Sequence, residues 1–197
     1  MTTNASGVTS PARRASLKMC GDCTLCCKVY EIEDFEKKPG KTCHNVRDEG
    51  GCGVWGLHPK ACQEFKCLWL KHDDMDGRWR PDHAGFVMRL EGKGTVCIDV
   101  DHDRPDAWRR EPYYSQLKAW SEVMPRNEGL VLVYAPEAMY VVTPMEDLPL
   151  KAPKKGDALE TGMEETLFGR RPYARVVPAR EAKRSRDTEF HFHKRAS

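Results

Sequence analysis

Crowded cysteines near the N-terminus are the feature that most constrains this chain. Eight of its nine cysteines lie between Cys20 and Cys67, and Cys97 stands apart. The first residues include basic side chains but no apolar segment of the kind that forms a secretory signal, so we expect a cytoplasmic protein with reduced thiols. Thiols at this density in a reducing compartment favour a metal site over disulfides. If the chain were secreted, the same cysteines would be expected to form a disulfide scaffold.

Length and charge indicate how the chain is organised. A chain of 197 residues suits one domain, which can bury roughly 70% of its unfolded surface without cross-links. The longest apolar run, residues 130–135, is far shorter than the roughly 20 residues that a membrane-spanning helix needs, so no membrane partner is expected. The total charge of +2 hides an uneven layout, because residues 1–19 carry +3 and residues 169–197 carry +6, which leaves −7 between them. We therefore expect an acidic body between two basic arms.

The spacing of the apolar residues predicts an α+β fold. The pattern indicates two strand pairs: residues 86–90 with 95–100, and residues 130–134 with 139–143. An amphipathic helix is expected over residues 112–124, with an apolar stripe made by Tyr113, Leu117, Trp120 and Met124. A small antiparallel sheet with this one helix across it would bury the stripe.

The predicted boundaries divide the chain into four parts. Residues 1–18 are expected to form a disordered basic arm, and residues 19–80 a cysteine-cluster metal-binding module in which ligands replace a conventional core. Residues 81–150 supply the sheet and the helix, packed with the module as one domain. Residues 151–197 are interpreted as a linker, with at most a short helix near Leu159–Phe168, followed by a basic tail.

The first four cysteines carry the chemistry. They form a C-x2-C-x2-C-C run, and on a regular helix their sulfurs would lie within an arc of about 120°: Cys20, Cys23, Cys26 and Cys27. This spacing resembles the ligand run of a [4Fe–4S] cluster in bacterial ferredoxins, although the usual C-P element is replaced here by an adjacent cysteine. Eight thiolates also suit two tetrahedral zinc sites, with the adjacent pair feeding the two sites separately. The spacing slightly favours iron–sulfur over zinc, and both alternatives stay open.

The downstream cysteines are more widely spaced. Cys43 and Cys52 flank a glycine-rich loop. Cys62 and Cys67 would point about 140° apart on a regular helix. Either that helix ends before Cys67, or the two sulfurs serve different partners.

Together these elements resemble a known family. The run CGDCTLCC, followed by Cys43, the step CGVW from Cys52 and the segment HPKACQEFKC from His58, is similar to the CxxCxxCC cysteine-cluster family of the YkgJ type, described as zinc- or iron-chelating proteins. The resemblance covers residues 19–70, and His58 replaces the arginine that the family commonly has before the proline. The resemblance implies a chelating set of eight thiolates: Cys20, Cys23, Cys26, Cys27, Cys43, Cys52, Cys62 and Cys67.

Other candidate residues have ordinary structural explanations. Cys97 fits a buried thiol within a strand. Two histidines could each replace a thiolate, but we expect them beside the site or on the surface: His44 and His58. An acidic run lacks the spacing of an EF-hand and is interpreted as a solvated turn: Asp99, Asp101 and Asp103.

The sequence predicts a metal-binding protein that holds zinc or an iron–sulfur cluster through eight thiolates, while its α+β body presents a surface to a protein partner. No nucleophile elbow, P-loop or dinucleotide fingerprint is present, so no catalytic residue is proposed. One alternative is a redox, electron-transfer or modifying enzyme with an iron–sulfur cluster. Another is a zinc-stabilised module that binds nucleic acid or protein through the basic arms, but few aromatics and no docking motif accompany those arms, which disfavours nucleic acid.

Overall fold

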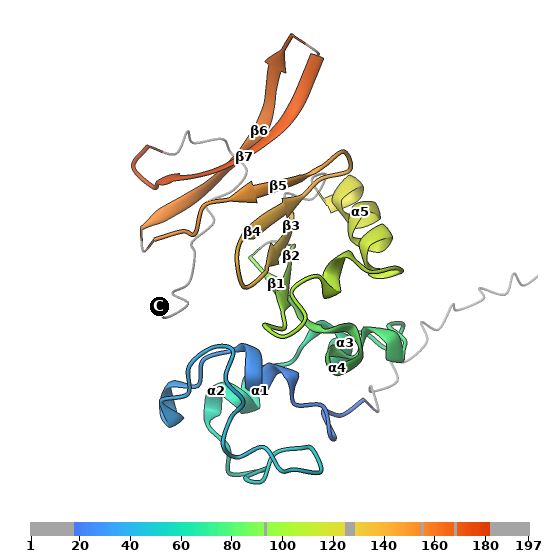
Figure 1. Cartoon of the computed structure of the whole chain (residues 1–197), viewed down its shortest axis with the longest axis vertical. Coiled ribbons are helices and arrows are strands. Elements are labelled where there is room, and N and C mark those ends of the chain that lie inside the picture. Colours follow the sequence, from blue (N-terminus) through green and yellow to red (C-terminus); the bar gives the residue numbers. More distant parts are fainter. Residues whose placement is uncertain (1–17, 93, 125–128, 155, 168, 182–197) are drawn as a thin grey trace, which may run out of the picture.

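The computed structural model describes residues 18–92, 94–124, 129–154, 156–167 and 169–181 (Figure 1). The predicted N-terminal arm lies outside these residues except for Lys18, and so does the part of the predicted basic tail that follows Glu181. None of the helices in the described ranges has the length and hydrophobicity that a membrane span requires.

Short helices and loops form the cysteine-rich region, which lies below the sheet in Figure 1. Its helices are each only four or five residues long: α1 (Leu25–Val29), α2 (Lys60–Glu64), α3 (Leu68–Lys71) and α4 (Pro81–Ala84). Two turns of 3-10 helix accompany them, η1 (Glu33–Phe35) and η2 (Gly77–Trp79). A helix that carries the first four cysteines together is therefore not formed. Gly21, at φ +56°, lies in a left-handed turn, and α1 begins only after it.

A mixed five-stranded sheet forms the centre of the chain, with the strands in sequential order. They are β1 (Phe86–Glu91), β2 (Thr95–Val100), β3 (Val131–Tyr134), β4 (Met139–Val142) and β5 (Asp147–Leu150). Both predicted strand pairs are confirmed as antiparallel hairpins. The prediction of a wholly antiparallel sheet is wrong, because β2 and β3 pair in parallel. The connection between them contains η3 (Ala107–Arg109) and α5 (Tyr113–Val123), a crossover that returns the chain to the end of the sheet where β2 began.

The main core lies between this sheet and α5. Alternate residues of β2 and β3 face the helix, and Leu117 and Trp108 are fully buried against them. Tyr113 is also buried there, while Trp120 and Met124 pack at the margin, which confirms the predicted apolar stripe.

A long β-hairpin replaces the short helix predicted near residues 159–168. The hairpin consists of β6 (Asp157–Thr166) and β7 (Gly169–Pro178), paired antiparallel. Leu159 lies opposite Val176 in this hairpin and packs on the sheet face that α5 leaves uncovered, beside Leu132 and Leu150. This tertiary contact outweighs any local helical preference. The strand β5 was also missed, since Pro149 argues against a strand except at a sheet edge, which is where β5 lies.

The cysteine-rich region packs on the same sheet face at the β1 end. Leu25, Val29 and Cys67 form an apolar cluster with Val87 in β1. Polar contacts reinforce the junction, because the Tyr30 hydroxyl donates to Asp99 Oδ2 at 2.6 Å and Arg89 Nε donates to the same atom at 2.9 Å.

The predicted solvated acidic turn is therefore wrong for two of its three members. Asp99 is 0% exposed and Asp101 is 4% exposed. Asp101 accepts from Lys28 Nζ at 2.5 Å and from Arg104 Nε at 3.1 Å, and only Asp103 keeps its side chain largely in solvent. Arg89 on the paired strand, Arg104 in the following turn and the distant Lys28 supply the cations that allow these carboxylates to be buried.

Candidate metal centre

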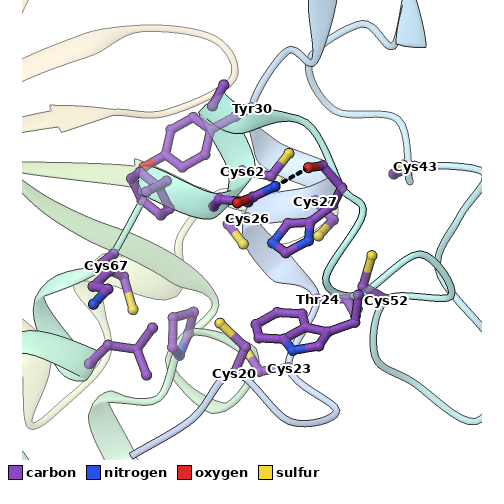
Figure 2. A pocket seen from close by; sticks show the side chains of 18 of the residues that line it. Cys20, Cys23, Thr24, Cys26, Cys27, Tyr30, Cys43, Cys52, Cys62 and Cys67 are labelled. Atoms are coloured by element: carbon purple, nitrogen blue, oxygen red, sulfur yellow. Dashed lines mark hydrogen bonds between the residues drawn. The ribbon is translucent and has the colours of Figure 1, made fainter. Parts of the chain in front are cut away.

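A single cavity of about 670 Å³ collects all eight clustered cysteines (Figure 2). The structure thus brings together the complete set that the sequence predicts: Cys20, Cys23, Cys26, Cys27, Cys43, Cys52, Cys62 and Cys67. All nine cysteines fall within the described residues, and all are free thiols. The ninth, Cys97, is 0% exposed in β2, which confirms its interpretation as a core thiol.

Short turns and helices position the first four thiols and Cys67. The amide of Cys23 donates to the carbonyl of Cys20 at 2.9 Å, which closes a tight turn. Cys26 and Cys27 follow on α1, where consecutive residues are rotated by about 100°, yet their thiols remain in hydrogen-bonding contact. Cys67 precedes α3 as its N-cap residue.

The remaining thiols come from the loops that follow α1. The amide of Cys43 donates to the carbonyl of Cys27 at 3.1 Å, so the two residues lie side by side. Cys52 forms an isolated bridge with Val46, whose own amide donates to the carbonyl of Cys43 at 3.0 Å. Cys62 lies on α2, which ends at Glu64, so the helix does end before Cys67 as one of the two predicted alternatives required.

Aromatic side chains form much of the remaining lining. Tyr30 and Phe65 meet edge to face, with ring centroids 4.9 Å apart, and Trp55 stacks on His58 at 4.8 Å. His58 Nδ1 accepts from the amide of Gly56 at 3.0 Å, so the ring is held at the wall of the cavity. Figure 2 shows the hydrogen bond, 2.6 Å long, by which the Gln63 side chain donates to the carbonyl of His58.

The other histidine near the cluster takes a different position. His44 is exposed and packs against Phe35, with ring centroids 5.2 Å apart. It does not line the cavity, whereas His58 does. The expectation that both lie beside the thiols or on the surface therefore agrees with their positions.

Burial, together with repulsion between neighbouring thiols, raises the pKa of most of these cysteines. Burial, followed by repulsion from Cys67 and Cys23, raises the pKa of Cys20 to about 11. Burial likewise raises the pKa of Cys23, Cys62 and Cys67. A neutral thiol is favoured at these positions because a thiolate in a partly buried, sulfur-rich cavity lacks solvation.

The adjacent pair on α1 behaves differently. A hydrogen bond from the Cys26 thiol lowers the pKa of Cys27 to about 7, although burial opposes it, and the positive charge of Lys37 assists. The same hydrogen bond and burial raise the pKa of Cys26 well above its ordinary value. Cys27 is therefore the thiol that the surroundings most favour as an anion.

Three cations that the sequence pattern did not single out lie beside the thiols. Lys37 is only 6% exposed, and its ammonium donates to the carbonyls of Lys28, at 2.8 Å, and Tyr30. Arg80 hydrogen bonds to Cys23, and Lys18 lies close enough to Cys67 to favour its anion. In the sequence Lys37 belongs to a Lys-Lys-Pro-Gly segment typical of an exposed turn, so no local signal marks it as buried.

The thiols share a cavity without forming a closed coordination shell. Among the described residues, no three His, Cys, Asp or Glu side chains are gathered tightly enough to hold an ion. The donors themselves are soft sulfur atoms, which suit zinc, copper(I) and iron–sulfur clusters rather than magnesium or calcium. Inward movement of the side chains would be needed to complete such a site.

Comparison with known proteins finds no relative of this chain. No protein-family model, no curated protein and no solved structure matches the chain.

Proposed function

We propose that this protein binds metal through the eight thiolates of its cysteine-rich region, as zinc or as an iron–sulfur cluster. The observation that carries the proposal is that eight cysteines from separate turns, helices and loops all line one cavity of about 670 Å³. Buried cysteines that act only as small apolar residues have no reason to converge from distant segments on one space. A shared soft cation or cluster supplies that reason.

The short elements of this region support the same proposal. Each of its helices has five residues or fewer, below the length at which a helix is stable alone in water. Burial, and after it repulsion between neighbouring thiols, disfavours the anions, as the raised pKa of Cys20 illustrates. A bound cation would relieve that repulsion and cross-link the loops, so that metal binding and folding of the region are coupled.

Metal analysis of the full chain tests the proposal. The protein is purified without oxygen, and its zinc, iron and sulfide contents are measured with its visible spectrum. Bound metal should exceed one equivalent, and broad absorption near roughly 400 nm with matching sulfide would identify an iron–sulfur cluster rather than zinc. Changing the eight cavity cysteines together to serine should abolish binding.

Cys97→Ser provides the matched control. This change also removes a buried thiol, but one that lies in β2 away from the cavity, so metal content should be unchanged. Less than about half an equivalent of any metal on fresh wild-type protein would refute the proposal, because a thiolate site of this kind holds its ion tightly near neutral pH. Undiminished metal in the eightfold variant would refute it equally.

A further inference from the structure

The eight thiols divide into two neighbourhoods within the shared cavity. In Figure 2, one group of labelled cysteines lies toward the Cys67 side of the cavity: Cys20, Cys23, Cys26 and Cys67. The other labelled cysteines lie toward the Cys43 side: Cys27, Cys43, Cys52 and Cys62. The electrostatic neighbours of the thiols follow this division in part, since Cys20 senses Cys67 and Cys23 more strongly than Cys27, whereas Cys62 senses Cys27, Cys43 and Cys52.

Backbone contacts hold the first group together. The turn between Cys20 and Cys23 is closed by its own hydrogen bond. Lys18, just before this turn, donates to the carbonyls of Trp69 and His72 at 3.2 and 2.6 Å. Because Trp69 lies two residues after Cys67, these bonds fasten the Cys20 turn to the start of α3.

A separate set of contacts holds the second group together. Cys43 is bonded through its amide to Cys27, and the bridge between Val46 and Cys52 keeps the next thiol nearby. The stacked rings of Trp55 and His58 join the loop after Cys52 to the segment that leads into α2 and Cys62.

The adjacent pair on α1 joins the two neighbourhoods, and the loop before Cys52 also packs on the Cys20 turn, where Gly51 lies against the carbonyl of Gly21. The two thiols of the pair hydrogen bond to each other, but consecutive helical residues are rotated by about 100°, so each of them can serve one group. We propose that the protein holds two separate four-thiolate sites, one made by Cys20, Cys23, Cys26 and Cys67 and the other by Cys27, Cys43, Cys52 and Cys62. This inference rests on the proposed metal binding and specifies which thiols share an ion.

Each site has its own positive charge. Four thiolates around one divalent ion leave a net charge of −2, which needs compensation when it is partly buried. The buried ammonium of Lys37 faces Cys27, Cys43 and Cys62 of the second site, and Cys26 in addition. The first site has Arg80 beside Cys23 and Lys18 near Cys67. Lys37 is therefore a positioning residue that supports the second site without binding its metal.

Anaerobic titration of the metal-free full chain with cobalt(II) distinguishes the two sites. The ligand-field and thiolate charge-transfer bands count tetrahedral thiolate sites directly. Wild-type protein should bind two equivalents, and either Cys67→Ser or Cys43→Ser should leave one. The variant Cys20→Ser/Cys67→Ser, altered twice within one group, should still bind one equivalent, whereas Cys43→Ser/Cys67→Ser should bind none.

Several outcomes would overturn the division. Loss of both sites in the Cys20→Ser/Cys67→Ser variant, or one retained site in the Cys43→Ser/Cys67→Ser variant, would show that the thiols are grouped differently. Cadmium NMR of wild-type protein covers the case in which a variant fails to fold. Two resonances without cadmium–cadmium coupling are expected, and coupling through a shared sulfur would contradict separate sites. Absence of any cobalt or cadmium binding would refute the proposed function itself, whereas binding with another grouping would refute the division alone.

The role of Lys37 is tested in backgrounds that keep one site. In the Cys67→Ser background, Lys37→Met should weaken cobalt binding about tenfold or more, as is usual when a supporting group of a metal site is removed. In the Cys43→Ser background, the same change should leave the affinity unaltered. Lys38→Met is the matched control, because its side chain is 66% exposed and pairs with Glu31. Equal effects in both backgrounds would refute the assignment of Lys37 to the second site.

Discussion

Tyr30→Phe tests whether the cysteine-rich region is fastened to the sheet by a buried hydrogen bond. The change removes one hydroxyl and keeps the ring that packs against Phe65. That hydroxyl donates to Asp99 Oδ2 at 2.6 Å, a length typical of a hydrogen bond to a carboxylate. Asp99 is 0% exposed, so water cannot replace the lost donor without rearrangement.

The expected loss follows from the charge of the acceptor. A hydrogen bond to a charged group contributes about 1.5–3 kcal/mol to stability. Arg89 still neutralises Asp99 through its own contact at 2.9 Å, so the larger penalty of an unpaired buried charge does not apply. At about 2–4 °C per kcal/mol for a chain of this size, the melting temperature should fall by roughly 3–12 °C.

Equilibrium urea unfolding, followed by tryptophan fluorescence, measures the effect on metal-free protein under reductant and again after metal loading. Tyr140→Phe is the control, since Tyr140 is half-buried against Trp108 and its hydroxyl has no hydrogen-bond partner among the described residues. This control should change the free energy of unfolding by less than about 0.5 kcal/mol. A loss as small for Tyr30→Phe would show that the junction does not depend on the hydroxyl.

Three further changes test the fold. Leu117→Ala, at a fully buried position of α5, should lower the free energy of unfolding by about 2–5 kcal/mol in urea; a loss below about 1 kcal/mol would contradict the core. Gly85→Ala should cost at least about 2 kcal/mol, because Gly85 has φ +85° and a Cβ there would lie 2.6 Å from that of Ala107. Burial raises the pKa of Asp101, but hydrogen bonds from Lys28, the amide of Asp103 and Arg104 outweigh it and lower the pKa overall. Its contribution should be complete above about pH 4 and lost as the pH falls through the lowered folded pKa. Asp101→Asn should flatten this acid dependence in unfolding measured against pH, and an unchanged slope would contradict the ion pair.

Local patterns in the sequence were sufficient to predict the elements that are specified by residues close together in the chain. The stripe from Tyr113 to Met124 specifies α5, and alternation around short turns specifies the two hairpins. The parallel pairing of β2 and β3 depends on how the crossover packs, which no local pattern encodes. The β6–β7 hairpin was missed for a related reason, since Leu159 becomes a core residue only when the sheet lies beneath it.

The candidate site, too, could be predicted from the sequence only in part. The eight cysteines were identifiable because sulfur chemistry is visible as residue type and spacing. Their supporting cations were not, since Lys37 becomes buried only when its ammonium reaches the carbonyls of Lys28 and Tyr30. Asp99 and Asp101 resembled a solvated turn because one partner of each, Tyr30 and Lys28 respectively, comes from about seventy residues earlier in the chain.

The position of Cys67 has a consequence for the protein's lifetime in a cell. Cys67 lines the cavity and also belongs to the apolar cluster with Leu25, Val29 and Val87. If the protein binds metal as proposed and the cysteine-rich region opens when the metal is lost, Val87, which is 0% exposed, would be uncovered near the start of β1. An uncovered apolar strand is a target for chaperones and proteases. Under the proposed metal binding, the abundance of this protein would then follow the supply of metal, even with no change in its synthesis.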